Sequence, residues 1–404
     1  MKSYLSLAWK ELKAQKVTSI LILIAIILST VMTTVVGQSI GILQAMRINQ
    51  AASLNGDRYV TFHQLSQEQA QQLSEDNRLT DVGSLINVGY TDLKNSGLTL
   101  YLREYCGDAL KAYPAISKIK EGHLPEKASE IALSEDSLRY LGLDAAVGDT
   151  VSLDMRVSVM DGSLPEFEYC GKFILTGILE SSYIGYSTGT VEGIVGNGTA
   201  EKLLPEEYLL YSTDFKTHDK KNFQSIVYDL AKNLDVEERY IQYNWILLDA
   251  VGISYDETSN SDAGAGFSFM TVACVLVGLL VLFAAGLVIY NILKISITKR
   301  IKEYGTLRAI GGERGQIYRL VSLQLLILCG IGIPIGLVLG TLAAKATLIA
   351  ATGALNPDIF MANSVSELNE AISAASTVKF PMLLASIAVT LLFALMAAFP
   401  AARY

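Results

Sequence analysis

The side chains that most often carry covalent or metal chemistry are few in this sequence and widely spaced. The three histidines, His63, His123 and His218, do not follow the spacing of a zinc site. The Gly-rich segment at 311–315 lacks the lysine of the phosphate-binding pattern G-x-x-x-x-G-K-[ST], and it follows an expected helix rather than a strand. No acid–base pair or nucleophile stands at a usable spacing. We therefore expect no catalytic residue, no metal site and no cofactor in this chain.

The four cysteines contain no Cys-x-x-Cys pair. Cys274 and Cys329 lie in apolar runs, where a thiol most often serves as a small packing group. Cys106 and Cys170 lie in a long polar region that we place outside the membrane, where disulfides persist. Spacing alone does not tell whether these two residues meet, so a disulfide and two free thiols both stay open.

A different chemistry, the docking of a partner protein, is indicated by a short basic segment. Between Lys294 and Arg319 there are seven lysines and arginines and two acidic residues. Apolar runs at 267–290 and 321–344 flank the segment, and each is long enough to cross a bilayer. Apolar residues recur at every third position in its middle, as in a short amphipathic helix: Ile301, Tyr304, Leu307 and Ile310. Such a helix either lies in the lipid headgroups or is gripped by a partner, and the periodicity does not decide between them.

The stretch KRIKEYGTLRAIGGERGQI resembles the coupling-helix signature of FtsX-like permeases, the membrane subunits of MacB-type ABC transporters. The resemblance implies a partner, an ABC ATPase dimer that binds ATP and Mg and hydrolyses the ATP. It also implies a second copy of the permease or a homologous permease half. It implies that one set of residues contacts the ATPase, with Tyr304 and Leu307 in its groove and Glu303 and Arg308 in ion pairs at the rim: Glu303, Tyr304, Leu307, Arg308, Ala309 and Gly311.

The composition of the chain indicates that this helix is held by membrane-spanning segments and indicates on which side of the membrane it lies. Hydrophobic residues make up 51% of the 404 residues, which favours a membrane protein. The net charge is −8, yet residues 38–266 hold 34 acidic and 18 basic residues, and residues 1–16 hold four lysines and one glutamate. Because basic loops stay in the cytoplasm, we place the N-terminus and the basic segment inside and the acidic region outside. The acidic region also argues against nucleic acid as a partner.

The fold class that we predict is an α-helical membrane protein with four transmembrane helices and an extracytoplasmic α+β domain between the first two helices. It would lie in the plasma membrane of a bacterium, in contact with the lipid bilayer. The predicted parts are an amphipathic helix at 1–16, spans at 17–37, 267–293, 317–351 and 380–400, the outer domain at 38–266, the coupling loop at 294–316, an outer loop at 352–379 and the start of a cytoplasmic tail at 401–404.

The outer domain shows strand and helix patterns. Strands are expected at 58–63, 82–90, 98–105, 131–133 and 172–179, and helices at 67–79 and 222–234. Another short helix should begin at Ser134 as its N-cap, and Gly148-Asp149 should turn the chain into a further strand. The order of elements in 121–153 resembles the periplasmic core domain of MacB-like permeases. In the third predicted span, Gly332, Gly336 and Gly340 form a stripe that packs either within the chain or against a second copy.

Three functions fit these patterns. The first is an ABC permease subunit that handles peptide, antibiotic or lipoprotein cargo. The second is an FtsX-like signalling subunit that activates a cell-wall hydrolase or senses antimicrobial peptides without transport. The third is an unrelated membrane receptor with no ATPase. Family members usually continue beyond the last span, so this sequence can also be the first half of a longer permease.

Overall fold

The computed structural model of the chain describes residues 4–94, 96–180, 189–255, 313–352 and 380–403, with single positions between 276 and 309. The chain forms two compact units. A helical unit comprises residues 1–46, 272–356 and 365–404, and a sheet unit comprises residues 47–271 and 357–364.

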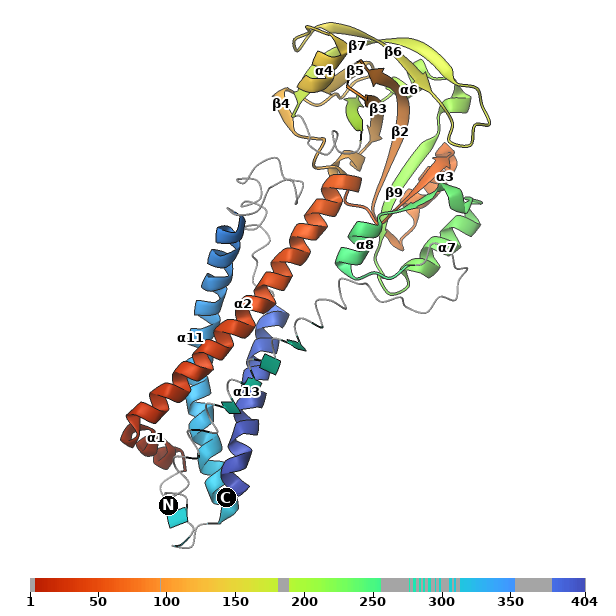
Figure 1. The fold of residues 1–404 in the computed structure, drawn as a ribbon. Coiled ribbons are helices and arrows are strands. Elements are labelled where there is room, and N and C mark those ends of the chain that lie inside the picture. Colours follow the sequence, from red (N-terminus) through yellow and green to blue (C-terminus); the bar gives the residue numbers. More distant parts are fainter. Residues whose placement is uncertain are drawn as a thin grey trace. The chain divides into compact units, whose positions relative to one another are not determined.

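Four described helices belong wholly or partly to the helical unit (Figure 1). They are α1 (Tyr4–Ala14), α2 (Lys16–Asn55), α11 (Arg314–Thr352) and α13 (Phe380–Arg403). Among the described residues, two stretches are long and apolar enough to cross a bilayer, Lys16–Ser39 of α2 and Tyr318–Thr347 of α11, with mean hydropathies of 2.6 and 2.4. A shorter apolar stretch, Leu383–Leu395, lies in α13. Of the predicted span at 267–293 only scattered positions are described, and the predicted outer loop falls outside the described residues after position 352, so the number of four spans stays a prediction.

The helix predicted at the N-terminus is confirmed as α1, and the burial of its side chains differs from one side to the other. Ala8 and Leu12 are buried, and Leu12 belongs to an apolar cluster with residues of α2, α11 and α13. Trp9 on another side is 46% exposed. The side chains of Glu11 and Gln324 are joined by a hydrogen bond, which ties α1 to α11.

The glycine stripe of α11 packs against α2 within the same chain. A methyl group on Gly336 would lie 2.5 Å from Cβ of Thr30 and 3.0 Å from the carbonyl oxygen of Ile27. Gly332 and Gly340 are equally close to α2, whereas Gly330 has no atom within 4 Å of the corresponding position. Of the two roles that the sequence left open for the stripe, the structure therefore shows packing within the chain.

Hydroxyl groups join α2 to α13. Oγ1 of Thr33 lies 2.6 Å from Oγ of Ser386, and Oγ1 of Thr30 lies 3.5 Å from Oγ1 of Thr390. All four side chains are buried. In an apolar surrounding, hydroxyl pairs of this kind hold neighbouring helices together by about 0.6 kcal/mol each on average.

The sheet unit is built on ten described strands in one sheet (Figure 1). The strands are β1 (Val60–Leu65), β2 (Leu79–Leu93), β3 (Leu98–Cys106), β4 (Ile119–Gly122), β5 (Glu130–Ser134), β6 (Thr150–Val157), β7 (Phe167–Leu179), β8 (Thr190–Val195), β9 (Tyr211–Thr217) and β10 (Ile241–Tyr243). Their order is β10-β1-β9-β2-β3-β8-β5-β7-β4, and β6 pairs with β7 and with β2. The contact of β6 with β2, at Tyr90 and Arg156, closes a ring of six strands.

One face of this sheet carries two apolar cores. The first core fills the ring of strands and includes Leu100, Leu102 and Phe173, all fully buried. The second lies where β1 and β9 pack against helices, and Phe62 and Phe215 form its centre. The helices of the unit are α3 (Gln67–Glu75), α4 (Glu135–Leu141), α6 (Thr199–Leu203), α7 (Phe223–Asn233) and α8 (Trp245–Val251), of which α3, α7 and α8 contribute to the second core.

The strands and helices predicted for this unit are confirmed, with shifted ends. The predicted helix at 67–79 stops at Glu75, and Leu79 already begins β2. Ser134 caps α4 by accepting a hydrogen bond from the backbone N–H of Ser137. Gly142 ends that helix in the left-handed conformation, with φ of 71°. The sequence analysis missed β4, β8, β9, β10, α6 and α8.

Candidate functional site

Six neighbouring strands, from β10 to β8, carry polar side chains on the face of the sheet that is turned away from the two apolar cores. Because side chains alternate along a strand, Val60 and Phe62 of β1 enter a core while Thr61 and His63 point to the opposite face. The set is completed by residues of the other five strands, and we call it the polar sheet face: Gln242, Thr61, His63, Ser212, Asp214, Asn87, Arg103, Tyr105 and Glu192.

A buried ion pair lies at one end of the polar sheet face. Arg58, in the segment before β1, is 7% exposed, and Asp214 of β9 is 1% exposed. Nε of Arg58 lies 3.2 Å from Oδ1 of Asp214. Thr61 donates a hydrogen bond to Oδ1, and the hydroxyl of Tyr113 donates one to Oδ2, each at 2.5 Å. Both oxygens of the Asp214 carboxylate therefore have partners, which a buried charge needs because it is removed from water. Burial and the nearby Asp214 carboxylate raise the pKa of Tyr113, which keeps its hydroxyl protonated.

A second ion pair joins Arg103 of β3 to Glu192 of β8. The guanidinium donates to Oε1 of Glu192, and the hydroxyl of Tyr105 donates to Oε2 at 2.8 Å. Burial opposes the charge of Arg103, but Glu192 together with Tyr105 and Tyr113 outweighs burial, so the pKa of Arg103 is raised and the charge is retained. Burial, with the charge of Glu192, also raises the pKa of Tyr105.

His63 links the polar groups of three strands. Its Nε2 lies 3.1 Å from Oε1 of Gln242, and its Nδ1 lies 2.9 Å from Oγ of Ser212. Oε1 of Gln242 also accepts a hydrogen bond from Nη2 of Arg58, at 3.3 Å. Since that oxygen is an acceptor, Nε2 is the donor and Nδ1 accepts from Ser212. Burial lowers the pKa of His63, more than the hydrogen bond to Gln242 raises it, so the ring is neutral at pH 7.

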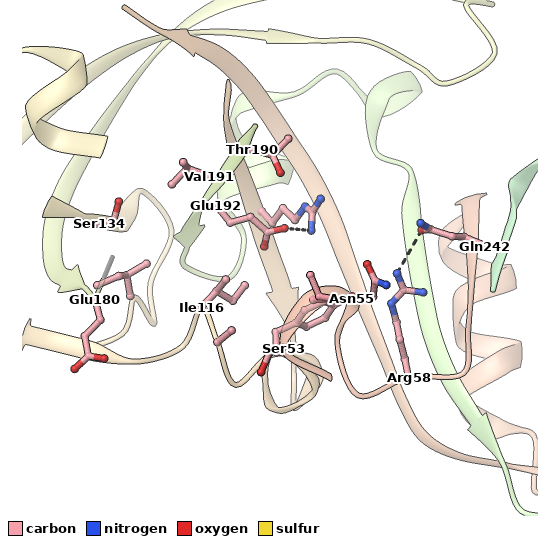
Figure 2. A pocket seen from close by; sticks show the side chains of 15 residues that line it. Ser53, Asn55, Arg58, Ile116, Ser134, Glu180, Thr190, Val191, Glu192 and Gln242 are labelled. Carbon is pink, nitrogen blue, oxygen red and sulfur yellow. Dashed lines mark hydrogen bonds and ion pairs between the residues drawn. The ribbon is translucent and has the colours of Figure 1, made fainter. Parts of the chain in front are cut away.

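Two cavities adjoin these residues. Cavity A, of about 250 Å³, lies against the last residues of α2 and the segment at 115–116 (Figure 2). Cavity B, of about 220 Å³, lies against the segment at 157–160. Four residues line both cavities: Arg58, Arg103, Tyr113 and Gln242. Figure 2 shows Glu192 and Gln242 on opposite sides of cavity A, with Arg58 held by Gln242.

Most polar groups of this arrangement are bonded to one another. The carboxylates and the tyrosine hydroxyls are already committed to one another, and neutral His63 has no nucleophile beside it other than the hydroxyl of Ser212. Within the described ranges, no group of three or more His, Cys, Asp or Glu side chains is placed to hold a metal ion. What the polar sheet face offers a ligand is charge, hydrogen bonds and a cavity.

The residues predicted to contact an ATPase are hardly covered by the structure. Ala309 is described, and it is helical and exposed. The other five, Glu303, Tyr304, Leu307, Arg308 and Gly311, lie outside the described residues, so their role stays a prediction.

Cys106 and Cys170 are both free thiols, so the structure does not contain the disulfide that the sequence left open. Cys106 ends β3 and Cys170 lies in β7, and two further strands, β8 and β5, separate β3 from β7 in the sheet. Neighbouring strands lie about 4.8 Å apart, whereas a disulfide needs Cα atoms within about 7 Å. The sequence could not show this, because strand order is not readable from spacing.

Comparison with known proteins finds one family model and one relative that match parts of this chain. Residues 275–404 match the family model described as FtsX-like permease C-terminal. The macrolide export ATP-binding/permease protein MacB of Chromobacterium violaceum is 22% identical to this chain over 238 residues. That match covers 55% of the chain and 36% of the relative, so the chain spans about a third of the length of the relative that it matches.

Proposed function

Because residues 275–404 belong to the FtsX-like permease family, we propose that this chain is the membrane subunit of an ABC-type transporter and that a separate ATPase drives it. The family match is the observation that carries the proposal. The matched region includes the basic segment with its expected amphipathic helix. The sequence contains no phosphate-binding loop, which favours ATP binding by another subunit that also supplies the Mg.

In this proposal the helix at 300–311 is the handle that the ATPase grips. Tyr304 and Leu307 occupy a groove on the ATPase, and Glu303 and Arg308 form ion pairs at its rim. Movement of the ATPase on ATP binding changes the packing of the spans and thereby the state of the sheet unit. Two features support such a device: α2 is a single helix from Lys16 to Asn55, and the packing of α2, α11 and α13 depends on close, shape-specific contacts.

The charge distribution supports a definite orientation. Residues 1–16 and 294–319 are basic, and residues 38–266 are acidic. We therefore propose that the N-terminus and the helix at 300–311 lie in the cytoplasm and that the sheet unit lies outside. Peptides, antibiotics and lipoproteins are the proposed cargo classes.

The substitution Leu307→Asp tests the proposed handle. A charge in the apolar groove should abolish stimulation of the ATPase by the permease, since an unpaired carboxylate would have to leave water. Insertion into the membrane should not change, because residue 307 lies outside the spans predicted from the sequence. The measurement is ATPase activity of the co-expressed complex in lipid nanodiscs.

The matched control is Leu307→Met, which keeps an apolar side chain of similar volume and should retain most of the activity. A Leu307→Asp protein that still co-purifies with its ATPase and is fully active would contradict the proposal.

A further inference from the structure

The exposed side of α1 carries basic side chains that no described residue neutralises. Lys10 and Lys13 stand three positions apart, so they share one side of the helix, and Lys16 follows at the first position of α2. All three lysines are exposed, and none of them forms an ion pair with a described residue. The acidic side chain of α1, Glu11, is bonded to Gln324 of α11. The positive charge of this side is therefore open to a ligand from outside the chain.

Apolar side chains border the lysines. Trp9 is 46% exposed, and the centre of its ring lies 5.7 Å from Nζ of Lys13. Leu7 is 49% exposed, and the exposed Val17 begins the apolar surface of the stretch Lys16–Ser39, which is long enough to cross a bilayer. Tryptophan and lysine side chains at the end of such a stretch are typical of the boundary between lipid tails and headgroups. The pattern indicates that α1 lies at this boundary.

The buried side of α1 is fixed to the rest of the helical unit. Ala8 and Leu12 are buried, and Leu12 belongs to the apolar cluster that it shares with residues of α2, α11 and α13. Oγ of Ser19 in α2 donates a hydrogen bond of 3.1 Å to the carbonyl oxygen of Leu12. Because these contacts hold the backbone that carries the lysines, a ligand does not have to order the helix when it binds, which favours binding.

We propose that Lys10, Lys13 and Lys16 form a headgroup site that prefers anionic phospholipids to zwitterionic ones. The ammonium groups donate hydrogen bonds to the phosphate oxygens, and the ring of Trp9 contacts the same lipids at the headgroup level. A zwitterionic lipid carries its own cation beside the phosphate, whereas an anionic lipid gains about fivefold in affinity for each lysine near it. The site requires that the helical unit is embedded in a membrane, and it is independent of coupling to an ATPase.

Trp9 can report on its own lipid neighbours, because the chain contains two tryptophans, Trp9 and Trp245. In the full chain with Trp245→Phe, Trp9 fluorescence is measured in nanodiscs of phosphatidylglycerol and phosphatidylcholine, with bromine on the acyl chains of one lipid at a time. Bromine quenches a tryptophan on contact, so the two quenching curves give the relative affinity of the lipids at Trp9. We expect a preference of about fivefold or more for phosphatidylglycerol at low salt, which decreases as salt is raised to about 1 M.

The variant Lys10→Gln/Lys13→Gln locates the site. The preference for phosphatidylglycerol should fall to about twofold or less, since two of the three charges are gone. The control is Lys127→Gln/Lys172→Gln, which removes the same charge from exposed positions of the sheet unit and should keep the preference of the parent. An equal preference in the two variants, or no preference in the parent, would overturn the proposal. Absence of quenching by either lipid would also overturn it, because the exposed side of α1 would then contact water or a protein.

Discussion

At the scale of single residues, the sheet unit holds charges that are almost completely removed from water. The pair of Arg58 and Asp214 is the clearest case, since both side chains are more than nine-tenths buried. Desolvation can cancel the Coulomb attraction of such a pair, but removal of one partner leaves the other charge buried and unpaired. The pair is therefore expected to matter most when only one of its members is changed.

Arg58→Met should lower the free energy of unfolding by about 3–5 kcal/mol, because Asp214 stays buried without its counter-charge. The double variant Arg58→Met/Asp214→Asn should recover a large part of this loss, since no charge is left and the amide oxygen can still accept from Thr61. The measurement is the denaturant midpoint of each variant in detergent micelles. If the loss of unfolding free energy in the double variant equals the sum of the losses in the two single variants, the two residues are not coupled.

His63 should make stability depend on pH. Its pKa in the folded chain is lowered from 6.5, mainly by burial, so below pH 6.5 the unfolded chain binds more protons than the folded one. Stability is thus fully present above pH 6.5 and falls as the pH drops towards the lowered pKa. Asp76, whose pKa is held below 3.8 by its hydrogen bond to Arg78, acts only at lower pH.

His63→Gln should flatten the fall in unfolding free energy between about pH 6.5 and 5, measured by denaturant titration at a series of pH values. His218→Gln, at the exposed His218, is the matched control and should keep the slope of the parent chain. If the slope of His63→Gln equals that of the parent, His63 is not the group responsible.

The sequence did not reveal the polar sheet face, although a signal was present. In β1 and β3, polar residues alternate with apolar ones, as in Leu100-Tyr101-Leu102-Arg103. This alternation indicates a strand with one buried face, but it does not show that the other face is covered as well. Arg58 and Asp214 lie 156 positions apart, and only the pairing of β1 with β9 brings them together.

At the scale of elements, the glycine stripe of α11 shows how a short-range pattern determines packing. Gly332, Gly336 and Gly340 stand one turn apart, so they share one side of the helix, and α2 approaches them closely. The sequence predicted close packing and could not tell which helix would provide it. Long apolar runs and capped helices were predictable because their signals are local. The strands β8, β9 and β10 are short or carry mixed side chains, and long-range pairing defines them.

Gly336→Ile should disrupt the contact of α11 with α2, because even its Cβ would lie 2.5 Å from Cβ of Thr30. We expect a loss of about 1–3 kcal/mol or more, the usual cost of overpacking. Gly330→Ile is the matched control, since no atom lies within 4 Å of a Cβ at that position. Thermal unfolding of both proteins in detergent gives the comparison, and equal midpoints would show that the stripe is not a tight contact.

At the scale of the whole molecule, the chain has a helical unit, which holds most of the residues that match the FtsX-like permease model, and a sheet unit with two cavities. The similarity to FtsX-like permeases was predictable because its signature is contiguous, in the stretch from Lys299 to Ile317. The cavities were not predictable, because their lining residues come from distant parts of the chain.

The most direct test of the central claim is photo-cross-linking from position 309, with a photoreactive amino acid in place of the exposed Ala309. Irradiation of native membranes, followed by mass spectrometry of the adduct, identifies the protein that contacts the helix. We expect an adduct with an ATP-binding subunit. The same probe at the exposed Trp245 of the sheet unit should give no such adduct. An adduct from position 309 that contains no ATP-binding protein, or only proteins from outside the cell, would contradict this expectation.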